Sequence, residues 1–361
     1  MRTSLYARGL LAIALSVAFL NGCGAVPIAN APVLPGNEAP AESASARRPV
    51  QTVPWIAALP EIFARRRPVD DSRAAGPAAQ LDPVATRTLV VCAISAGVCT
   101  VFSRPGYKPL RTIVHGLNAP GGVVAGIGGR IYVANSGGAN VRIYAPGGTH
   151  PIETLNDPGA VPIDVALAKQ TTIVSNLSAG SSTNVAVYVG GAKSPSYTLS
   201  DPLAQQGIGV AVDAGGNCFW SVDTSSGAQI DQFPGCKKNA HPLRLKASLG
   251  SAGGLAFDGA GNLWYADQSS GVYRCVGVMS CTLVVASSPS CTPGVTLCDP
   301  VMINFDRNFT TLFVADAGYG VYTVRSFGGG VSPDYVVTPI LQAPGMPIGV
   351  GPDPAPTLPP H

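Results

Sequence analysis

The sequence has few charged residues. Asp, Glu, Lys and Arg make up 12% of its 361 residues, about half of the roughly 25% that is typical of soluble proteins. From residue 89 onward it carries 14 Lys or Arg and 14 Asp or Glu, so this part has no net charge. A nucleic-acid-binding surface needs a basic stripe that neutralises phosphates. The even balance therefore argues against a nucleic-acid partner.

The sequence also lacks an apolar run long enough to cross a bilayer. Its longest apolar run, Leu10–Leu20, has 11 residues, whereas a membrane-spanning helix needs about 20. This run follows Arg2 and Arg8, and a short apolar run after basic residues is typical of a secretory signal peptide. We therefore predict that residues 1–22 are a signal peptide and take no part in the fold.

The predicted signal peptide ends in Leu20-Asn21-Gly22-Cys23, which resembles the lipobox of bacterial lipoproteins. The resemblance implies that Cys23 is lipidated and becomes the first residue of the mature protein. Several acyl chains on one residue would anchor the protein stably, since a single chain binds only marginally. The residue after the cysteine is Gly24 rather than Asp. By resemblance to bacterial lipoproteins, this favours the outer membrane of a two-membrane bacterium. An ordinary secreted protein with an incidental Cys23 is the competing interpretation.

The motifs of common enzyme classes are missing. The sequence contains no G-x-S-x-G nucleophile elbow, no H-E-x-x-H zinc motif and no P-loop. It has four histidines, which occupy no equivalent positions in the repeat described below and which we interpret as loop residues: His115, His150, His241 and His361. No catalytic residue is therefore predicted.

Residues 23–88 are rich in Pro, Ala and Ser and show no sustained periodicity. This composition predicts a flexible tether. Two fragments interrupt it, the apolar Val53–Pro60 and the basic Arg65–Arg67. They suit docking to a partner or to anionic lipid headgroups, but we favour an apolar segment packed on the domain beside a solvated charge run. Residues 354–361 are predicted to be a disordered tail.

A unit of two strands joined by a tight turn recurs along the rest of the chain. In its clearest copy, Gly253–Gln268, an Asp-x-x-Gly-Asn turn starts at Asp258 and the second strand ends at Asp267. Val210–Asp223 repeats the pattern with a turn at Asp213. Weaker copies lie at residues 122–135, 163–176 and 303–316. A period of about 40 to 50 residues matches one blade of a β-propeller.

The two ends of this region complete each other. The first unit, from Leu89, lacks an innermost strand, whereas Pro347–Pro352 supplies an innermost strand with nothing after it. Pairing the chain ends predicts an all-β, six-bladed β-propeller over residues 89–353, without exposed sheet edges. Several candidate innermost strands begin in glycine, which lets strands crowd around the axis.

Two segments, Ile131–Ser136 and Asn140–Gly147, and the two Asp-x-x-Gly-Asn turns carry a resemblance to a known family. They resemble the NHL-repeat and gluconolactonase-like six-bladed propellers. For the gluconolactonase-like enzymes the resemblance implies a metal held by acidic and amide side chains in the central funnel. The family's Glu near the start of the first innermost strand is missing, because Ala119–Gly122 occupies that region.

The repeat places an Asp or Asn at the end of each second strand. Equivalent positions in a ring face the same end of a propeller, and Ca²⁺ takes oxygen ligands of these kinds. The candidate metal ligands are Asn135, Asn176, Asp223, Asp267 and Asp316. We favour the alternative that these side chains close turns through local hydrogen bonds. Asp213, Asp258 and Asp306, at the opposite end, are predicted to be purely structural.

Eight cysteines besides Cys23 fall into four close pairs. A zinc site is the alternative to disulfides, but the sequence has no C-x-x-C and the spacings do not suit zinc. Because disulfides persist in oxidising compartments, this reading agrees with export. The predicted disulfides are Cys92–Cys99, Cys218–Cys236, Cys275–Cys281 and Cys291–Cys298.

These features predict a lipid-anchored, extracytoplasmic and non-enzymatic binding or scaffold module of the cell envelope, in the periplasm or at the outer membrane. We expect a monomer whose partner is an envelope protein or glycan. A metal-dependent lactonase-like hydrolase is the rival, and recognition of an envelope polysaccharide is a third reading. A local basic cluster could contact an acidic glycan, although we favour a solvated hairpin: Lys237, Lys238, Arg244 and Lys246.

Overall fold

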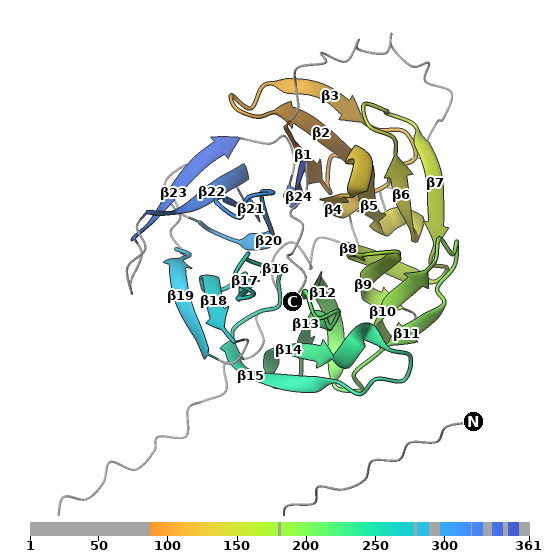
Figure 1. Cartoon of the computed structure of the whole chain (residues 1–361), viewed down its shortest axis with the longest axis vertical. Helices are drawn as coiled ribbons and strands as arrows, with labels where there is room; N and C mark the ends of the chain where they lie inside the picture. The colour runs from red at the N-terminus through yellow and green to blue at the C-terminus, as the bar shows by residue number, and fades with distance from the viewer. Residues whose placement is uncertain are drawn as a thin grey trace, which may run out of the picture. The chain divides into compact units, whose positions relative to one another are not determined.

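The computed structural model describes residues 87–179, 182–277, 280–288, 297–318, 320–327, 334–341 and 346–353. The described residues form six antiparallel sheets of four strands each. The sheets are arranged as blades around a common centre (Figure 1). This is the predicted six-bladed β-propeller. The predicted signal peptide, Cys23, nearly all of the tether and the predicted tail lie outside the described residues.

Blades 1 to 3 occupy the first half of the propeller. Blade 1 is β4 (Pro120–Ala125), β5 (Ile131–Asn135), β6 (Asn140–Tyr144) and β7 (Pro151–Asn156). Blade 2 is β8 (Ala160–Ala168), β9 (Thr171–Ala179), β10 (Ser182–Val189) and β11 (Tyr197–Leu199). Blade 3 is β12 (Ala204–Val212), β13 (Cys218–Thr224), β14 (Gly227–Phe233) and β15 (Leu243–Leu249).

Blades 4 to 6 complete the ring. Blade 4 is β16 (Leu255–Phe257), β17 (Leu263–Asp267), β18 (Gly271–Val276) and β19 (Ser280–Ala286). Blade 5 is β20 (Pro300–Phe305), β21 (Leu312–Asp316), β22 (Gly320–Phe327) and β23 (Asp334–Leu341). Blade 6 is β24 (Pro347–Asp353), β1 (Thr88–Ala93), β2 (Val98–Ser103) and β3 (Pro109–Ile113). Short 3₁₀ turns are η1 (Ile127–Gly129), η2 (Ser136–Gly138) and η3 (Pro234–Cys236).

Blade 6 closes the ring by joining the two ends of the propeller. The C-terminal strand β24 pairs with the N-terminal strand β1, with Val91 opposite Val350 and Thr88 opposite Asp353. The predicted closure is therefore confirmed. Each innermost strand also contacts the innermost strand of the next blade, so β4, β8, β12, β16, β20 and β24 surround the axis.

Glycines allow the innermost strands to approach one another closely. A Cβ atom at Gly209 would lie 2.3 Å from the carbonyl oxygen of Gly253 in the next blade. A Cβ atom at Gly349 would lie 2.2 Å from the carbonyl oxygen of Gly121. Real Cβ atoms do not approach backbone oxygens at such distances, so only glycine fits. The prediction that innermost glycines permit crowding at the axis is confirmed.

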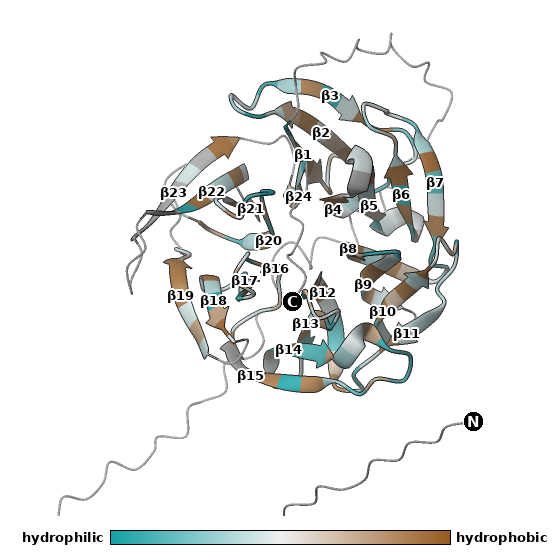
Figure 2. Cartoon of the chain, viewed as in Figure 1, coloured by the Kyte–Doolittle hydropathy of each residue, from teal (hydrophilic) through white to brown (hydrophobic). Residues whose placement is uncertain are grey.

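Aromatic residues of the second strands fill the spaces between blades. Phe219 of blade 3 packs edge-on against Phe257 of blade 4, with ring centroids 4.9 Å apart. Trp264 of blade 4 contacts Phe305 of blade 5 in the same way, at 5.5 Å. The buried Trp220 donates its Nε1–H to the Ser175 hydroxyl of blade 2, at 2.9 Å. Apolar residues recur along the strands of every blade (Figure 2). The hydrophobic core therefore lies largely between neighbouring blades.

The turns between first and second strands are structural, as the sequence indicates. Asp258 accepts hydrogen bonds from the Asn262 amide at 2.9 Å and from Trp264 Nε1 at 3.0 Å. Asp213 accepts from the Asn217 amide at 2.8 Å. Asp306 likewise accepts from two backbone amides beyond its turn. A carboxylate that bonds the amides of its own turn fixes the bend between two strands.

Three of the four predicted disulfides are formed: Cys92–Cys99, Cys218–Cys236 and Cys275–Cys281. Cys298 is also disulfide-bonded, and its predicted partner Cys291 lies outside the described residues. Cysteine thiols are kept reduced in the cytosol, whereas disulfides persist in oxidising compartments. They therefore indicate an extracytoplasmic environment. Within the described part of the chain, no helix has the length and apolar character of a membrane span.

Candidate functional site

The five residues considered as metal ligands all lie at or near the ends of second strands. Their strands are β5, β9, β13, β17 and β21. The side chains are almost completely buried: Asn135, Asn176, Asp223, Asp267 and Asp316. What these buried side chains bind decides whether their oxygens are available to a metal.

Two of the acids hold the chain segment that enters the innermost strand of their own blade. Asp267 accepts hydrogen bonds from the Gly250 amide at 2.6 Å and from the Ser269 amide at 2.9 Å. Asp316 accepts from the amides of Cys298 at 2.6 Å and Asp299 at 3.1 Å. Backbone amides thus occupy both carboxylates, and a carboxylate that bonds several amides is a strong loop anchor.

The two asparagines perform the same kind of anchoring. The Asn135 carboxamide oxygen accepts a hydrogen bond from the Asn118 amide at 2.6 Å, and its nitrogen donates to the Gly116 carbonyl at 3.1 Å. Asn176 donates to Asp157 Oδ2 at 2.9 Å. The Asn176 oxygen is buried and has no hydrogen-bond partner within the part of the chain that the structure describes, which makes it the least satisfied group of the five.

Asp223 differs from the others because it reaches into the next blade. Its Oδ1 accepts a hydrogen bond from the Ala252 amide at 2.9 Å. Burial raises the pKa of Asp223 to about 6, and the nearby Asp267 charge adds to the rise. These two candidate ligands are close enough to interact. Across the described residues, however, no three His, Cys, Asp or Glu side chains come together in a way that could hold a metal ion.

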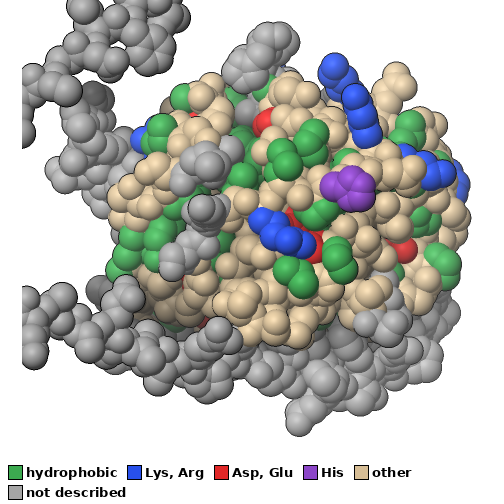
Figure 3. All heavy atoms as spheres, turned by 90° about the horizontal axis from the view of Figure 1, so that it is seen from below, with side chains coloured by type: hydrophobic (Ala, Val, Ile, Leu, Met, Phe, Trp, Pro, Cys, Tyr) green, Lys and Arg blue, Asp and Glu red, His purple; other side chains and the backbone are tan. Residues whose placement is uncertain are grey.

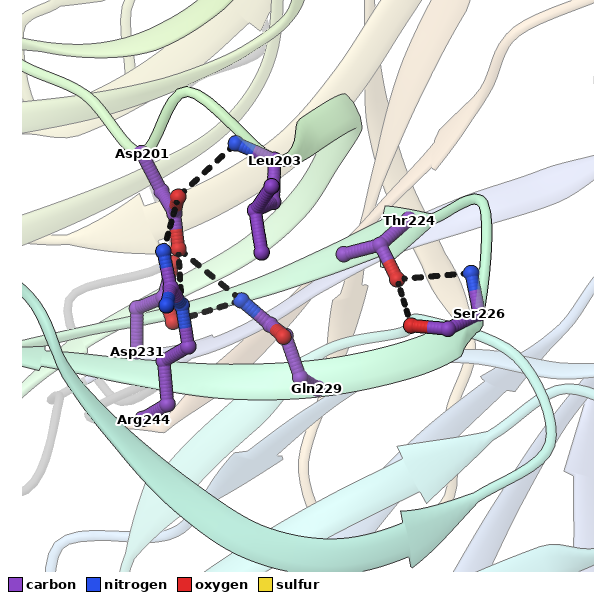
Figure 4. A network of polar contacts seen from close by, with 7 residues as sticks. All are labelled: Asp201, Leu203, Thr224, Ser226, Gln229, Asp231 and Arg244. Atoms are coloured by element: carbon purple, nitrogen blue, oxygen red, sulfur yellow. Dashed lines mark hydrogen bonds and ion pairs between the residues drawn. The ribbon is translucent and has the colours of Figure 1, made fainter.

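A second polar cluster lies in blade 3, and the sequence does not reveal it. Asp201, just before β12, forms a two-pronged ion pair with Arg244 of β15, with both N–O distances at 2.8 Å. Gln229 of β14 donates to Asp201 at 3.0 Å and to Asp231 at 2.9 Å, so one amide bridges two acids (Figure 4). Asp231 is completely buried, and its side chain also interacts with that of Asp201.

The electrostatics of this cluster separate its two acids. The Arg244 guanidinium lowers the pKa of Asp201, whereas burial and the neighbouring Asp201 charge raise the pKa of Asp231 to about 7. Asp231 therefore tends to stay protonated beside an ionised Asp201. Arg244 was predicted as part of a basic cluster, but its ion pair shows that it serves the fold. The sequence of β14 gives no sign that Asp231 is buried, as it is in the structure.

The innermost strands line a cavity of about 150 Å³ that is open to solvent. Its lining combines residues from all six innermost strands, mostly Val, Ala, Leu, Ile, Phe and Met. Two polar side chains interrupt this apolar wall, Asp164 of β8 and Asn304 of β20. The strands β8 and β20 lie on opposite sides of the ring (Figure 1). A carboxylate and a carboxamide therefore border one small, otherwise apolar space.

Asp164 is held in place by backbone amides. Its Oδ1 accepts a hydrogen bond from the Val165 amide at 2.8 Å, and its Oδ2 accepts from the Val210 amide of blade 3 at 3.0 Å. A Cβ atom at Gly122 would lie 2.2 Å from Asp164 Oδ1, so glycine at this position makes room for the carboxylate. Burial raises the pKa of Asp164 to about 7. The sequence gives no signal for this residue beyond its place in an innermost strand.

The His150 Nδ1 atom lies 3.4 Å from the Thr149 hydroxyl, and no acid is hydrogen-bonded to a histidine ring within the described residues. His115, His150 and His241 lie in turns or loops, as predicted. The rings of His115 and His150 are stacked with their centroids 3.9 Å apart. His361 lies outside the described residues. One side of the molecule shows isolated Lys, Arg, Asp and Glu side chains among much uncharged surface (Figure 3), which agrees with the low charge content.

No protein-family model matches the sequence, and no curated protein matches it. Solved structures do match the propeller. A chain in the crystal structure of a nidogen/laminin complex has a TM-score of 0.55 at 14% identity, with 75% of this chain and 100% of that chain covered. A protein of unknown function from Bacteroides caccae also has a TM-score of 0.55 at 14% identity, with 74% and 98% covered. At this identity the likeness shows the fold alone, because one fold hosts many functions.

Proposed function

We propose that the protein is a lipid-anchored, extracytoplasmic β-propeller that acts as a non-enzymatic binding or scaffold module in the cell envelope. The lipobox-like Leu20–Cys23 supports the anchor. The three disulfides support an oxidising compartment. The tether-like composition of residues 23–88 suits a domain held away from a membrane surface.

The observation that carries the non-enzymatic role is the use of the strand-end side chains. Asp267 and Asp316 bond the amides of loops, and Asn135 bonds an amide and a carbonyl. Groups committed to such bonds are poor candidates for substrate chemistry, because moving them would leave buried amides unpaired. The propeller thus offers a rigid ring and loops suited to binding.

A metal-dependent lactonase-like hydrolase is the second candidate. The proximity of Asp223 and Asp267 favours it, since carboxylate oxygens are ligands of Ca²⁺; burial raises the pKa of Asp223, and the Asp267 charge adds to the rise. Against it stand the amide partners of both acids. The expected family Glu is also replaced by residues of Ala119–Gly122.

Two measurements on the full chain separate these proposals. Cells grown with labelled palmitate should label the wild-type protein, and Cys23→Ala should lose the label while Cys99→Ala keeps it. Equal labelling of Cys23→Ala would refute the anchor. Purified protein should hydrolyse no sugar lactone in the presence of Ca²⁺ or Zn²⁺, whereas turnover that is lost in Asp267→Asn would establish the hydrolase.

A further inference from the structure

We propose that the central cavity binds a small organic ammonium ion, with Asp164 as its counter-ion and Asn304 as a second polar contact. This inference rests on the proposed binding role and gives it a ligand class. It starts from three properties of the cavity: its size, its apolar wall and the placement of its two polar side chains.

The carboxylate of Asp164 has bonding capacity left over. An ionised carboxylate has about four lone-pair positions, and two backbone amides, those of Val165 and Val210, occupy one on each oxygen. In the described chain no Lys, Arg or His forms an ion pair with Asp164. The side chain is half-buried and borders the cavity. When Asp164 is ionised, its charge therefore has no counter-charge among the described residues.

Asn304 supplies the second polar contact. Its side chain has no hydrogen-bond partner among the described residues, it is half-buried, and it lines the same cavity from β20. A carboxamide can accept an N–H or donate to an oxygen. Its position across the ring from Asp164 suits a ligand that reaches from one side of the cavity to the other.

The volume limits the ligand. A cavity of about 150 Å³ elsewhere accepts a benzene-sized molecule, so the ligand has roughly six non-hydrogen atoms. The aliphatic wall suits a short hydrocarbon body, and Asp164 suits an ammonium head through charge-assisted hydrogen bonds. A bare Ca²⁺ ion needs six to eight oxygen ligands, more than one carboxylate and one carboxamide provide. An anion would be repelled by the negative charge of ionised Asp164.

The raised pKa of Asp164 gives this site a distinctive pH dependence. The group titrates at about 7 because burial disfavours its charged form, and no other titratable side chain of the described chain lines the cavity. An alkylammonium ion stays charged throughout this range. Since it needs the ionised carboxylate, its affinity should rise by up to about tenfold between pH 6 and pH 8.

The test is calorimetric titration of the full chain with cyclopentylammonium chloride, with cyclopentanol as the uncharged probe of the same shape. We expect saturable binding of the ammonium ion that is at least tenfold tighter than that of the alcohol. Tetrapropylammonium, which is too large for the cavity, should not bind. Asp164→Asn should weaken ammonium binding at least tenfold and remove its pH dependence. Glu153→Gln removes an acid from β7, outside the cavity, and should leave binding unchanged.

Several outcomes would overturn the proposal: no saturable binding of cyclopentylammonium, equal binding of the alcohol, or undiminished binding in a folded Asp164→Asn. If that variant does not fold, the comparison of the three probes and the pH profile of the wild-type protein decide. Failure here is distinguishable from failure of the proposed function. Labelled palmitate and lactone assays report on the anchor and on catalysis whether or not the cavity takes an ammonium ion.

Discussion

Replacing Gly209 by alanine tests whether the innermost strands meet as closely as the ring requires. The added Cβ atom would lie 2.3 Å from Gly253 O, 2.7 Å from Gly254 Cα and 2.9 Å from Leu255 N. All three atoms belong to the backbone of the next blade, so no side chain can rotate away. The backbone of Gly209 is not left-handed, and the cost of the substitution is therefore one of space.

Overpacking a core typically costs about 1 to 3 kcal/mol, and contacts with backbone place Gly209→Ala at or above the upper end. A loss of about 3 kcal/mol should appear in the free energy of unfolding from denaturant titration, with an unchanged slope. In a domain of this size it lowers the melting temperature by about 5 °C.

Gly318→Ala is the matched control. Its added Cβ atom would meet nothing nearer than Asp316 Oδ1, at 3.5 Å. Alanine at a compatible glycine position stabilises by about 0.4 to 1 kcal/mol through the unfolded chain, so the control should be unchanged or slightly more stable. A Gly209→Ala protein within about 1 kcal/mol of wild type, beside a control that behaves as described, would refute the close packing of blades 3 and 4.

Three further predictions concern the polar groups and a disulfide. The folded state holds a proton on Asp231 up to about pH 7, whereas the unfolded chain releases it near pH 4, so the free energy of unfolding should fall as pH rises from about 4 to 7. Denaturant titrations at several pH values should show a shallower fall for Asp231→Asn. An identical pH dependence in the variant would contradict the raised pKa of Asp231. Asp267→Ala leaves the Gly250 amide without its acceptor and should cost about 1 to 3 kcal/mol, with faster hydrogen exchange at Gly250 as the readout; unchanged exchange would show that the loop is held by other contacts. The Cys218–Cys236 disulfide closes a separation of 18 residues, so a Cys218→Ser, Cys236→Ser double variant should lose about 3 kcal/mol of stability, and a melting temperature equal to that of the wild-type protein would show that the disulfide is dispensable.

The blades could be predicted from sequence because their signals are local. The Asp258 turn, the strand that ends at Asp267 and the aromatic pair between them lie within about one repeat, and each is fixed by neighbours in the chain. Ring closure through β1 and β24 followed from the same pattern, since an incomplete first unit and an isolated last strand need each other. The hairpin disulfides followed from strand register.

The polar contacts of Asp164 and Asp201 could not be predicted, because each joins residues that lie far apart in the sequence. Asp164 binds the Val210 amide 46 positions away, and Asp201 pairs with Arg244 43 positions away. Neither pair has a fixed spacing or a motif. The sequence pattern identified the strand-end residues and favoured local hydrogen bonds, such as the one that Asp267 accepts from the Ser269 amide. It did not indicate the more distant bond from the Gly250 amide. The sequence pattern also could not establish the protein family, since proteins of unrelated function share the same blade structure.

The most direct test of a binding module whose strand-end acids are structural is the melting temperature of the purified protein with and without metal. We predict the same melting temperature in chelator, in Ca²⁺ and in Zn²⁺, because the oxygens of Asp267 and Asp316 already accept backbone amides. A saturable rise with either metal that disappears in Asp267→Asn would contradict this assignment and favour the metal-dependent hydrolase.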